Sequence, residues 1–331
     1  MAQITAALVK ELREITGAGM MDCKKALEEA GDNIDAAVEI VRAKGQAIAA
    51  KRSDREASEG CVLCKAENGF GAIIALKCET DFVATNADFI KLAQTILDAA
   101  FEAKAKDIEE VKALTIDGKT IADLVTERSG ITGEKMELDG YNTITGTNII
   151  CYNHQNKNML CTMVALNEEG NAEVGKLIAM QVAAMNPLAI DENGVPANIK
   201  EEEYKVAVEK TKEEQVEKAV QNALKKAGFN LYIAENEEHI AEGIAKGNIT
   251  EAQADEIRNI KKTVAEEKLA NLPEQMIANI ANGRMAKFYK ESCLLNQEFC
   301  MDGSKTVSQM LKEASSTLTV TAFKRFTLRA D

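Results

Sequence analysis

The sequence predicts an α+β protein with a small three-helix N-terminal module, duplicated α+β core subdomains and an inserted helical coiled-coil arm. Only three of the 331 residues are Pro, and Ala, Glu, Lys and Ile are abundant, which favours helices. Pairs of short apolar runs, at residues 60–65 and 72–77 and again at 145–152 and 159–166, are typical of strands. The charged run at 200–272 is typical of long exposed helices.

These patterns also predict the domain boundaries. We expect the following divisions: residues 1–55 as a three-helix, ubiquitin-associated-like docking module, 56–140 as an N-terminal core subdomain, 141–199 with 273–331 as a C-terminal core subdomain, and 200–272 as the helical insertion.

The N-terminal module is predicted from apolar residues at helical spacing. In the first helix they are Ile4, Leu8, Leu12 and Ile15, all expected to face inward. Thr16–Gly19 should end that helix, Asp22 should cap the second, and Gly45 should close the third. Three short helices bury too little apolar surface to be very stable alone, so a docking role suits them better than catalysis.

The first core subdomain begins with a predicted hairpin, because Asn68-Gly69 lies between two apolar runs. The segment Lys77–Ala84 then connects a strand to a helix and presents Asp81 beside Phe82. A ring can wedge into an apolar crevice of a partner while the adjacent carboxylate disturbs hydrogen bonds or a metal shell. In the alternative interpretation, Thr80 or Asp81 caps a local turn and Phe82 fills the core.

The order of strand, polar turn, strand, acidic loop and helix in residues 60–100 recurs from residue 145 onward. A duplicated α+β unit explains this recurrence. The acidic loop of the second copy, Asn167–Glu169, contains no aromatic residue. Only the first copy could therefore act as a wedge.

Within residues 200–272, apolar side chains are sparse among Glu and Lys. A narrow apolar seam on a charged helix fits a coiled-coil arm or a helical hairpin, and a single solvated surface helix is the alternative. Thr250 and Gln253 match a capping box, which predicts the start of a further helix.

The net charge of −13 argues against direct nucleic-acid binding, because such a field repels phosphate backbones. No signal peptide or long apolar segment is evident, so we expect a cytoplasmic protein with no membrane partner. The eight Cys fit a reducing compartment. Cys61 and Cys64 have CxxC spacing, but on a strand they point to opposite faces and cannot chelate one metal. We expect no metal, no cofactor and no catalytic constellation, and hence no enzyme.

Three groups of residues carry a resemblance to a known family. Met1–Ala6, Val9–Arg13 and Thr16–Leu27 resemble the start of bacterial elongation factor Ts. Thr80–Ala84 resembles the second signature of that family. Its C-terminal core is matched by Gly283–Met285 and Ser304–Val307.

The resemblance implies a guanine-nucleotide exchange factor that acts on the translational GTPase elongation factor Tu. It implies that Thr80, Asp81, Phe82 and Val83 enter the GTPase near its Mg²⁺ ion, where Phe82 would disturb the metal's water shell. Further GTPase contacts are implied for Arg13, Met20, Met21 and His154, and a weaker one for Gly130. Without the resemblance, the Met pair would be core residues, and Arg13 and His154 would be solvated.

The resemblance also implies that the helical insertion serves dimerisation, as a homodimer or a 2:2 complex with the GTPase. Two other classes of function stay open on the sequence alone. One is an adaptor that binds without changing GDP release. The other is a redox or metal enzyme that uses Cys61 and Cys64.

Overall fold

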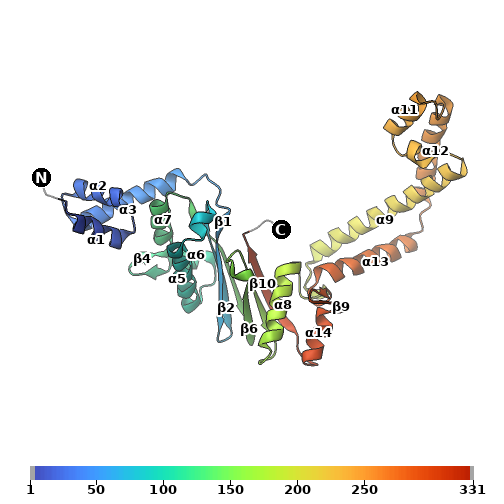
Figure 1. The fold of residues 1–331 in the computed structure, drawn as a ribbon. Coiled ribbons are helices and arrows are strands. Elements are labelled where there is room, and N and C mark those ends of the chain that lie inside the picture. The colour runs from blue at the N-terminus through green and yellow to red at the C-terminus, as the bar shows by residue number, and fades with distance from the viewer. Residues whose placement is uncertain (1–3, 329–331) are drawn as a thin grey trace. The chain divides into compact units, whose positions relative to one another are not determined.

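The computed structural model describes residues 4–328, which form two compact units (Figure 1). The first comprises the described residues up to Ile190 and those from Glu298 onward, and the second is Asp191–Gln297. Helices and strands both occur, which confirms the mixed α and β class. Met1–Gln3, where the resemblance begins, lie outside the described residues. Between residues 4 and 328, no helix is both long and apolar enough to cross a membrane.

The first unit opens with three helices: α1 (Ala6–Thr16), α2 (Met20–Ala30) and α3 (Ile34–Lys51). Leu12, Cys23 and Leu27 form the centre of their shared core, and each is fully buried. Two details differ from the prediction. Ile15, in the last turn of α1, is 55% exposed and does not face the buried core of the module. Gly19, not Asp22, is the N-cap of α2, and Asp22 lies in its first turn.

The prediction that Gly45 closes the third helix is wrong, because α3 runs on to Lys51 and Gly45 is buried inside it. The reason is a close crossing with α7 (Ile121–Thr132). A Cβ atom on Gly130 of α7 would lie 2.2 Å from the Cα of Gly45, a distance that real Cβ atoms do not reach. Gly45 is therefore needed for the close packing of α3 on α7 and does not end the helix.

The first sheet has three antiparallel strands in the order β1-β2-β5. They are β1 (Glu59–Glu67), β2 (Phe70–Cys78) and β5 (Met136–Thr145). Asn68 and Gly69 join β1 to β2 with φ of 51° and 76°. This pair of positive φ values is typical of the two-residue turn that matches strand twist, so the predicted hairpin is confirmed.

The β2 strand is buried on both faces, which explains its continuous apolar run. Ile74 and Leu76 face a core covered by helices, whereas Ile73 and Ala75 face the second sheet. The covering helices are α5 (Ala87–Ala103), α6 (Ile108–Ala113) and α7, with a small hairpin of β3 (Thr115–Ile116) and β4 (Lys119–Thr120) between the last two.

The second sheet has the order β10-β7-β6 and is also antiparallel. Its strands are β6 (Asn148–Asn153), β7 (Leu160–Leu166) and β10 (Val320–Thr327). The short helix η1 (His154–Asn156) connects β6 to β7, and α8 (Ala172–Met185) follows. In each sheet a hairpin is extended by a third strand that pairs with the hairpin's second strand. A small hairpin of β8 (Glu298–Phe299) and β9 (Asp302–Thr306) precedes α14 (Val307–Ala314).

The β5 strand is missing from the sequence prediction, and it crosses the expected boundary between residues 140 and 141. Asp139-Gly140 has the composition of a turn, which hides the strand. In the structure a Cβ atom on Gly140 would lie 2.2 Å from the Phe326 ring of β10. Gly140 therefore makes room for an aromatic side chain of the facing sheet, and the register also shifts beside it, between Ala75 and Leu76.

The second unit is helical and extends beyond the expected insertion of 200–272. It contains the short helix η2 (Glu192–Gly194), α9 (Ala197–Lys226), α10 (Leu231–Ala234), α11 (Glu237–Ala245), α12 (Glu251–Ala270) and α13 (Glu274–Ser292). Helix α13 belongs to this unit because it packs along α9, where Arg284 pairs with Glu214 at 2.7 Å. The predicted capping box of Thr250 and Gln253 starts α12.

The crossing of α3 and α7 should be sensitive to a single methyl group. We expect Gly130→Ala to lower the free energy of unfolding of the first unit by about 1–3 kcal/mol, because the new Cβ overlaps Gly45. Amide hydrogen exchange in α3 should become faster. Gly283→Ala is the control, since Gly283 is helical and meets no atom within 4 Å. Equal exchange in α3 for both variants would contradict the account.

Candidate functional site

The segment after β2 forms a single-turn helix, α4 (Asp81–Ala84), whose two sides differ sharply in exposure. Thr80 is its N-cap, and its hydroxyl accepts the backbone N–H of Val83. Val83 packs against the helix-covered core and Ala84 is buried in it. Phe82 is 83% exposed, and Asp81 is exposed beside it. The alternative interpretation in which Phe82 fills the core is therefore wrong, whereas the cap at Thr80 that it also included is present.

The start of α4 is held by the carboxylate of Glu134, which follows the C-terminal end of α7. The Thr80 hydroxyl donates to Glu134 Oε1 at 2.7 Å, and the Thr80 backbone N–H donates to Glu134 Oε2 at 3.1 Å. Hydrogen bonds to a charged acceptor are stronger than neutral ones. These bonds fix Thr80, the base of the exposed turn, whereas Asp81 and Phe82 at its tip remain exposed to solvent.

Glu79 holds the same base from the other side. Its carboxylate accepts the backbone N–H of Lys135 at 2.5 Å and the guanidinium groups of Arg52 and Arg55 at 3.1 and 2.9 Å. Burial disfavours the charged form of Glu79, but these three donors outweigh it and lower the pKa to about 2. Because Arg52 and Arg55 directly follow α3, the N-terminal module is connected to the base of α4.

The predicted contact residues of the N-terminal module are exposed. Met20 and Met21, the first two residues of α2, are 62% and 63% exposed, so neither fills the core. Arg13 is exposed near the end of α1. The exposed Ile15 lies two residues beyond it and adds a further apolar side chain. Arg13, Met20 and Met21 are therefore all accessible to a partner.

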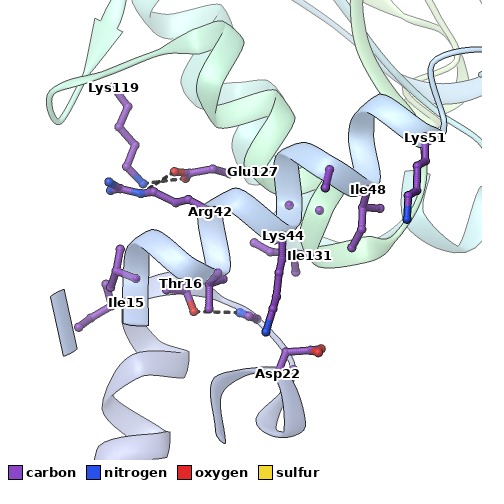
Figure 2. Close-up of a pocket in the computed structure, with 17 residues that line it drawn as sticks. Ile15, Thr16, Asp22, Arg42, Lys44, Ile48, Lys51, Lys119, Glu127 and Ile131 are labelled. Carbon is purple, nitrogen blue, oxygen red and sulfur yellow. Dashed lines mark hydrogen bonds and ion pairs between the residues drawn. The ribbon is translucent and has the colours of Figure 1, made fainter. Parts of the chain in front are cut away.

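A cavity of about 310 Å³ lies between α3, α7 and the segment that joins α1 to α2 (Figure 2). Ile15, Ile48 and Ile131 are among its apolar lining residues, and Arg42 and Lys119 both pair with Glu127 at its edge. None of the predicted contact residues of the module lines it. We therefore regard it as the imperfectly filled junction of these helices.

His154 begins η1, and it is half-buried, not freely exposed as a lone turn residue would be. Its Nδ1 lies 3.1 Å from the Tyr152 hydroxyl, and the two rings meet edge to face. The structure therefore places eight of the predicted residues on three separate local elements, the N-terminal module, α4 and η1, and the weaker candidate Gly130 on α7.

The arrangement of Cys61 and Cys64 disfavours a metal or redox site at this pair. Cys61 lies in the helix-covered core, whereas Cys64 packs between the two sheets, so they occupy opposite faces of β1. Burial raises the pKa of Cys61 to about 12, which keeps it a neutral thiol. Within the described chain, no group of three or more His, Cys, Asp or Glu is placed to hold a metal ion.

Glu79 and Glu134 are absent from the sequence-predicted site. Glu79 directly precedes the signature Thr80–Ala84, but a carboxylate beside a strand end is ordinarily a solvated residue. Glu134 is 54 positions away from Thr80, and no sequence spacing indicates their pairing. Only the fold brings these carboxylates to the base of α4.

Comparisons with known proteins agree on one family. The family model described as elongation factor TS matches residues 79–255 and 241–330. The elongation factor Ts of Phocaeicola vulgatus is 61% identical over 328 residues, and that of Bacteroides fragilis is 60% identical, each covering 99% of both chains. The elongation factor Ts of Porphyromonas gingivalis is 43% identical over 329 residues with the same coverage.

The exposed turn and the exposed methionines place the candidate site on the surface of the chain, as in proteins that act by contacting a partner. The family match identifies the protein class. The chain belongs to the elongation factor Ts family of translation elongation factors.

The lowered pKa of Glu79 predicts acid-sensitive stability. Since its pKa is about 2 in the folded chain against an ordinary value of 4.5, the stabilisation is complete above pH 4.5 and is lost as pH falls toward 2. Glu79→Gln should therefore lower the free energy of unfolding by about 1–2 kcal/mol at pH 7.

This difference between Glu79→Gln and the unchanged chain should shrink as pH falls from 5 toward 2.5, measured by urea unfolding at each pH. Glu169→Gln is the control, because its side chain is exposed in a loop. A difference that stays constant across this pH range would contradict the assignment.

Proposed function

We propose that this protein is a guanine-nucleotide exchange factor for elongation factor Tu, which binds the GDP form of that GTPase and accelerates release of GDP. The observation that carries the proposal is the pairing of exposed Phe82 with exposed Asp81 on a turn whose base is fixed. Membership of the elongation factor Ts family supports the partner. In this proposal the chain makes and breaks no covalent bond, so it is not an enzyme.

Linkage explains how such a protein acts. A factor that binds the empty GTPase more tightly than the GDP form must weaken GDP binding by the same ratio, because coupling between two binding sites is reciprocal. A difference of about 5.5 kcal/mol moves a two-state equilibrium from roughly 1:99 to 99:1. The factor therefore needs no contact with the guanine base.

The Thr80–Val83 turn is the proposed acting group. Phe82 would enter the GTPase beside the elements that hold Mg²⁺, and Asp81 would act there through its charge or through hydrogen bonds. Mg²⁺ demands nearly octahedral coordination and tolerates little displacement of its ligands and waters. A ring inserted at that place would weaken the binding of Mg²⁺ and, as a result, the binding of the diphosphate.

The N-terminal module is the proposed dock. Arg13, Met20 and Met21 would bind the GTPase domain, and His154 would provide a second contact from the core. Exposed Met side chains adapt well to a partner surface. The two sheets of the first unit would be copies of one α+β unit, of which only the first carries an aromatic tip.

Dimerisation of the chain, as a homodimer or a 2:2 complex with the GTPase, is proposed for the helical second unit. Its long α9 is mostly solvated along its length and packs against α12 and α13 of the same unit.

Release of fluorescently labelled GDP from elongation factor Tu distinguishes the proposal from an adaptor. An exchange factor raises the release rate until the GTPase is saturated. An adaptor forms a complex but leaves the release rate unchanged, and that result would refute the proposed function.

Truncation of the ring should slow exchange without unfolding the chain. We expect Phe82→Ala to lower the maximal GDP release rate roughly ten- to a hundredfold, because an aromatic side chain that is buried only in the complex contributes about 1.5–3 kcal/mol. Phe82→Leu should be intermediate. Tyr232→Ala truncates another exposed aromatic side chain and should exchange as the unchanged chain does. Unchanged release by Phe82→Ala would exclude the wedge.

Truncation of the two exposed methionines should lower the affinity for the GTPase and leave the maximal release rate nearly unchanged. We expect Met20→Ala with Met21→Ala to weaken binding to nucleotide-free elongation factor Tu roughly thirtyfold, equivalent to about 2 kcal/mol of lost apolar burial. The release rate at saturation should stay within twofold. Titration calorimetry and stopped-flow fluorescence measure the two quantities. Leu188→Ala with Met301→Ala, two exposed apolar residues elsewhere, is the control; an equal loss of affinity there would argue against a dock.

A further inference from the structure

We propose that Glu134 is a positioning residue for exchange, which holds the Thr80–Val83 turn in its protruding orientation; this rests on the proposed function. Its two carboxylate oxygens accept separate hydrogen bonds from one residue, the hydroxyl and the backbone N–H of Thr80. Two bonds from one carboxylate fix both the position and the rotation of the N-cap. Glu134 itself does not reach the exposed tip.

The Thr80 hydroxyl transmits this constraint into α4. While its hydrogen is donated to Glu134, its oxygen accepts the backbone N–H of Val83 at 3.4 Å. The Thr80 carbonyl in turn accepts the N–H of Ala84 at 3.1 Å. The rotamer that Glu134 selects for Thr80 is therefore the rotamer that caps the helix carrying Phe82.

Glu134 is itself held rigidly by its backbone. The hydroxyl of buried Ser129 donates to the Glu134 carbonyl at 2.5 Å, and the Glu134 N–H donates to the Thr132 hydroxyl at 3.3 Å. Gly133, with φ of 71°, ends α7 just before it. Because these bonds use only the backbone of Glu134, removal of its side chain leaves them intact and removes the bonds to Thr80.

The same stretch of chain also supports the N-terminal module. Gly130, one turn before Glu134, packs on Gly45 of α3, and Lys135, the next residue, donates its N–H to Glu79. The C-terminal end of α7 and the residues just after it thus support both the N-terminal module and the exposed turn at Thr80–Val83. A rigid base lowers the entropy lost when the tip enters a partner, which is the general advantage of preorganisation.

The test is GDP release from elongation factor Tu, measured by stopped-flow fluorescence over a range of factor concentrations. We expect Glu134→Ala to lower the maximal release rate about five- to tenfold and to change the half-saturating concentration less than twofold, because the dock is untouched. Glu137→Ala is the matched control, since it removes a carboxylate of the same chain segment that pairs with Lys135 and not with Thr80.

Three further variants separate positioning from loss of structure. Glu134→Gln retains one acceptor oxygen and should be intermediate, and Thr80→Ala removes one of the two donors to Glu134 and should also lower the maximal release rate. Thr80→Ala combined with Glu134→Ala should lose less than the product of the two single losses, since both remove one shared interaction. Amide hydrogen exchange at Thr80–Ala84 should be faster in Glu134→Ala than in Glu137→Ala.

The outcomes are distinct. If the unchanged chain accelerates GDP release and Glu134→Ala matches Glu137→Ala in maximal rate and amide exchange, the positioning role is refuted. If the double variant lowered the maximal release rate by the full product of the two single losses, the positioning role would also be refuted. If the unchanged chain does not accelerate release, the proposed function fails, while faster amide exchange in Glu134→Ala would still support the structural part of the inference.

Discussion

The shortness of α4 is the constraint on which the candidate site depends. A single helical turn has room for one buried side, and Val83 and Ala84 occupy it against the helix-covered core. Asp81 and Phe82 are therefore directed into solvent. An exposed Phe forgoes about 1.5–3 kcal/mol of apolar burial in the free chain, and that free energy becomes available when a partner covers the ring.

Helix α7 links the two exposed surfaces of the first unit. At Gly130 it meets Gly45 of α3 at backbone distance, and just beyond its C-terminal end Glu134 fixes the N-cap of α4. Glu79 adds a second support, because it joins the residues after α3 to the residue after Glu134. Residues of one short segment, 130–135, thus contact the supports of both the N-terminal module and α4.

Much of the fold follows from local sequence patterns. The features that were not predicted depend on contacts between residues far apart in the sequence. The Asn68-Gly69 hairpin, the capping box at Thr250 and the alternately facing cysteines on β1 were predictable, because each depends on neighbouring residues. Gly45 was predicted to end a helix, and the strand that contains Gly140 was not predicted. Both make room for a distant group, the backbone of α7 and the ring of Phe326. In the candidate site, the family signature indicates the turn that carries Phe82, whereas Glu134 depends on a contact across 54 positions.

A structure of the complex with nucleotide-free elongation factor Tu tests the central claim most directly. The account predicts that Phe82 is buried in the GTPase beside the elements that hold Mg²⁺, with the hydrogen bonds between Thr80 and Glu134 intact. A complex in which Phe82 remains in solvent, or turns into the core of its own chain, would contradict it.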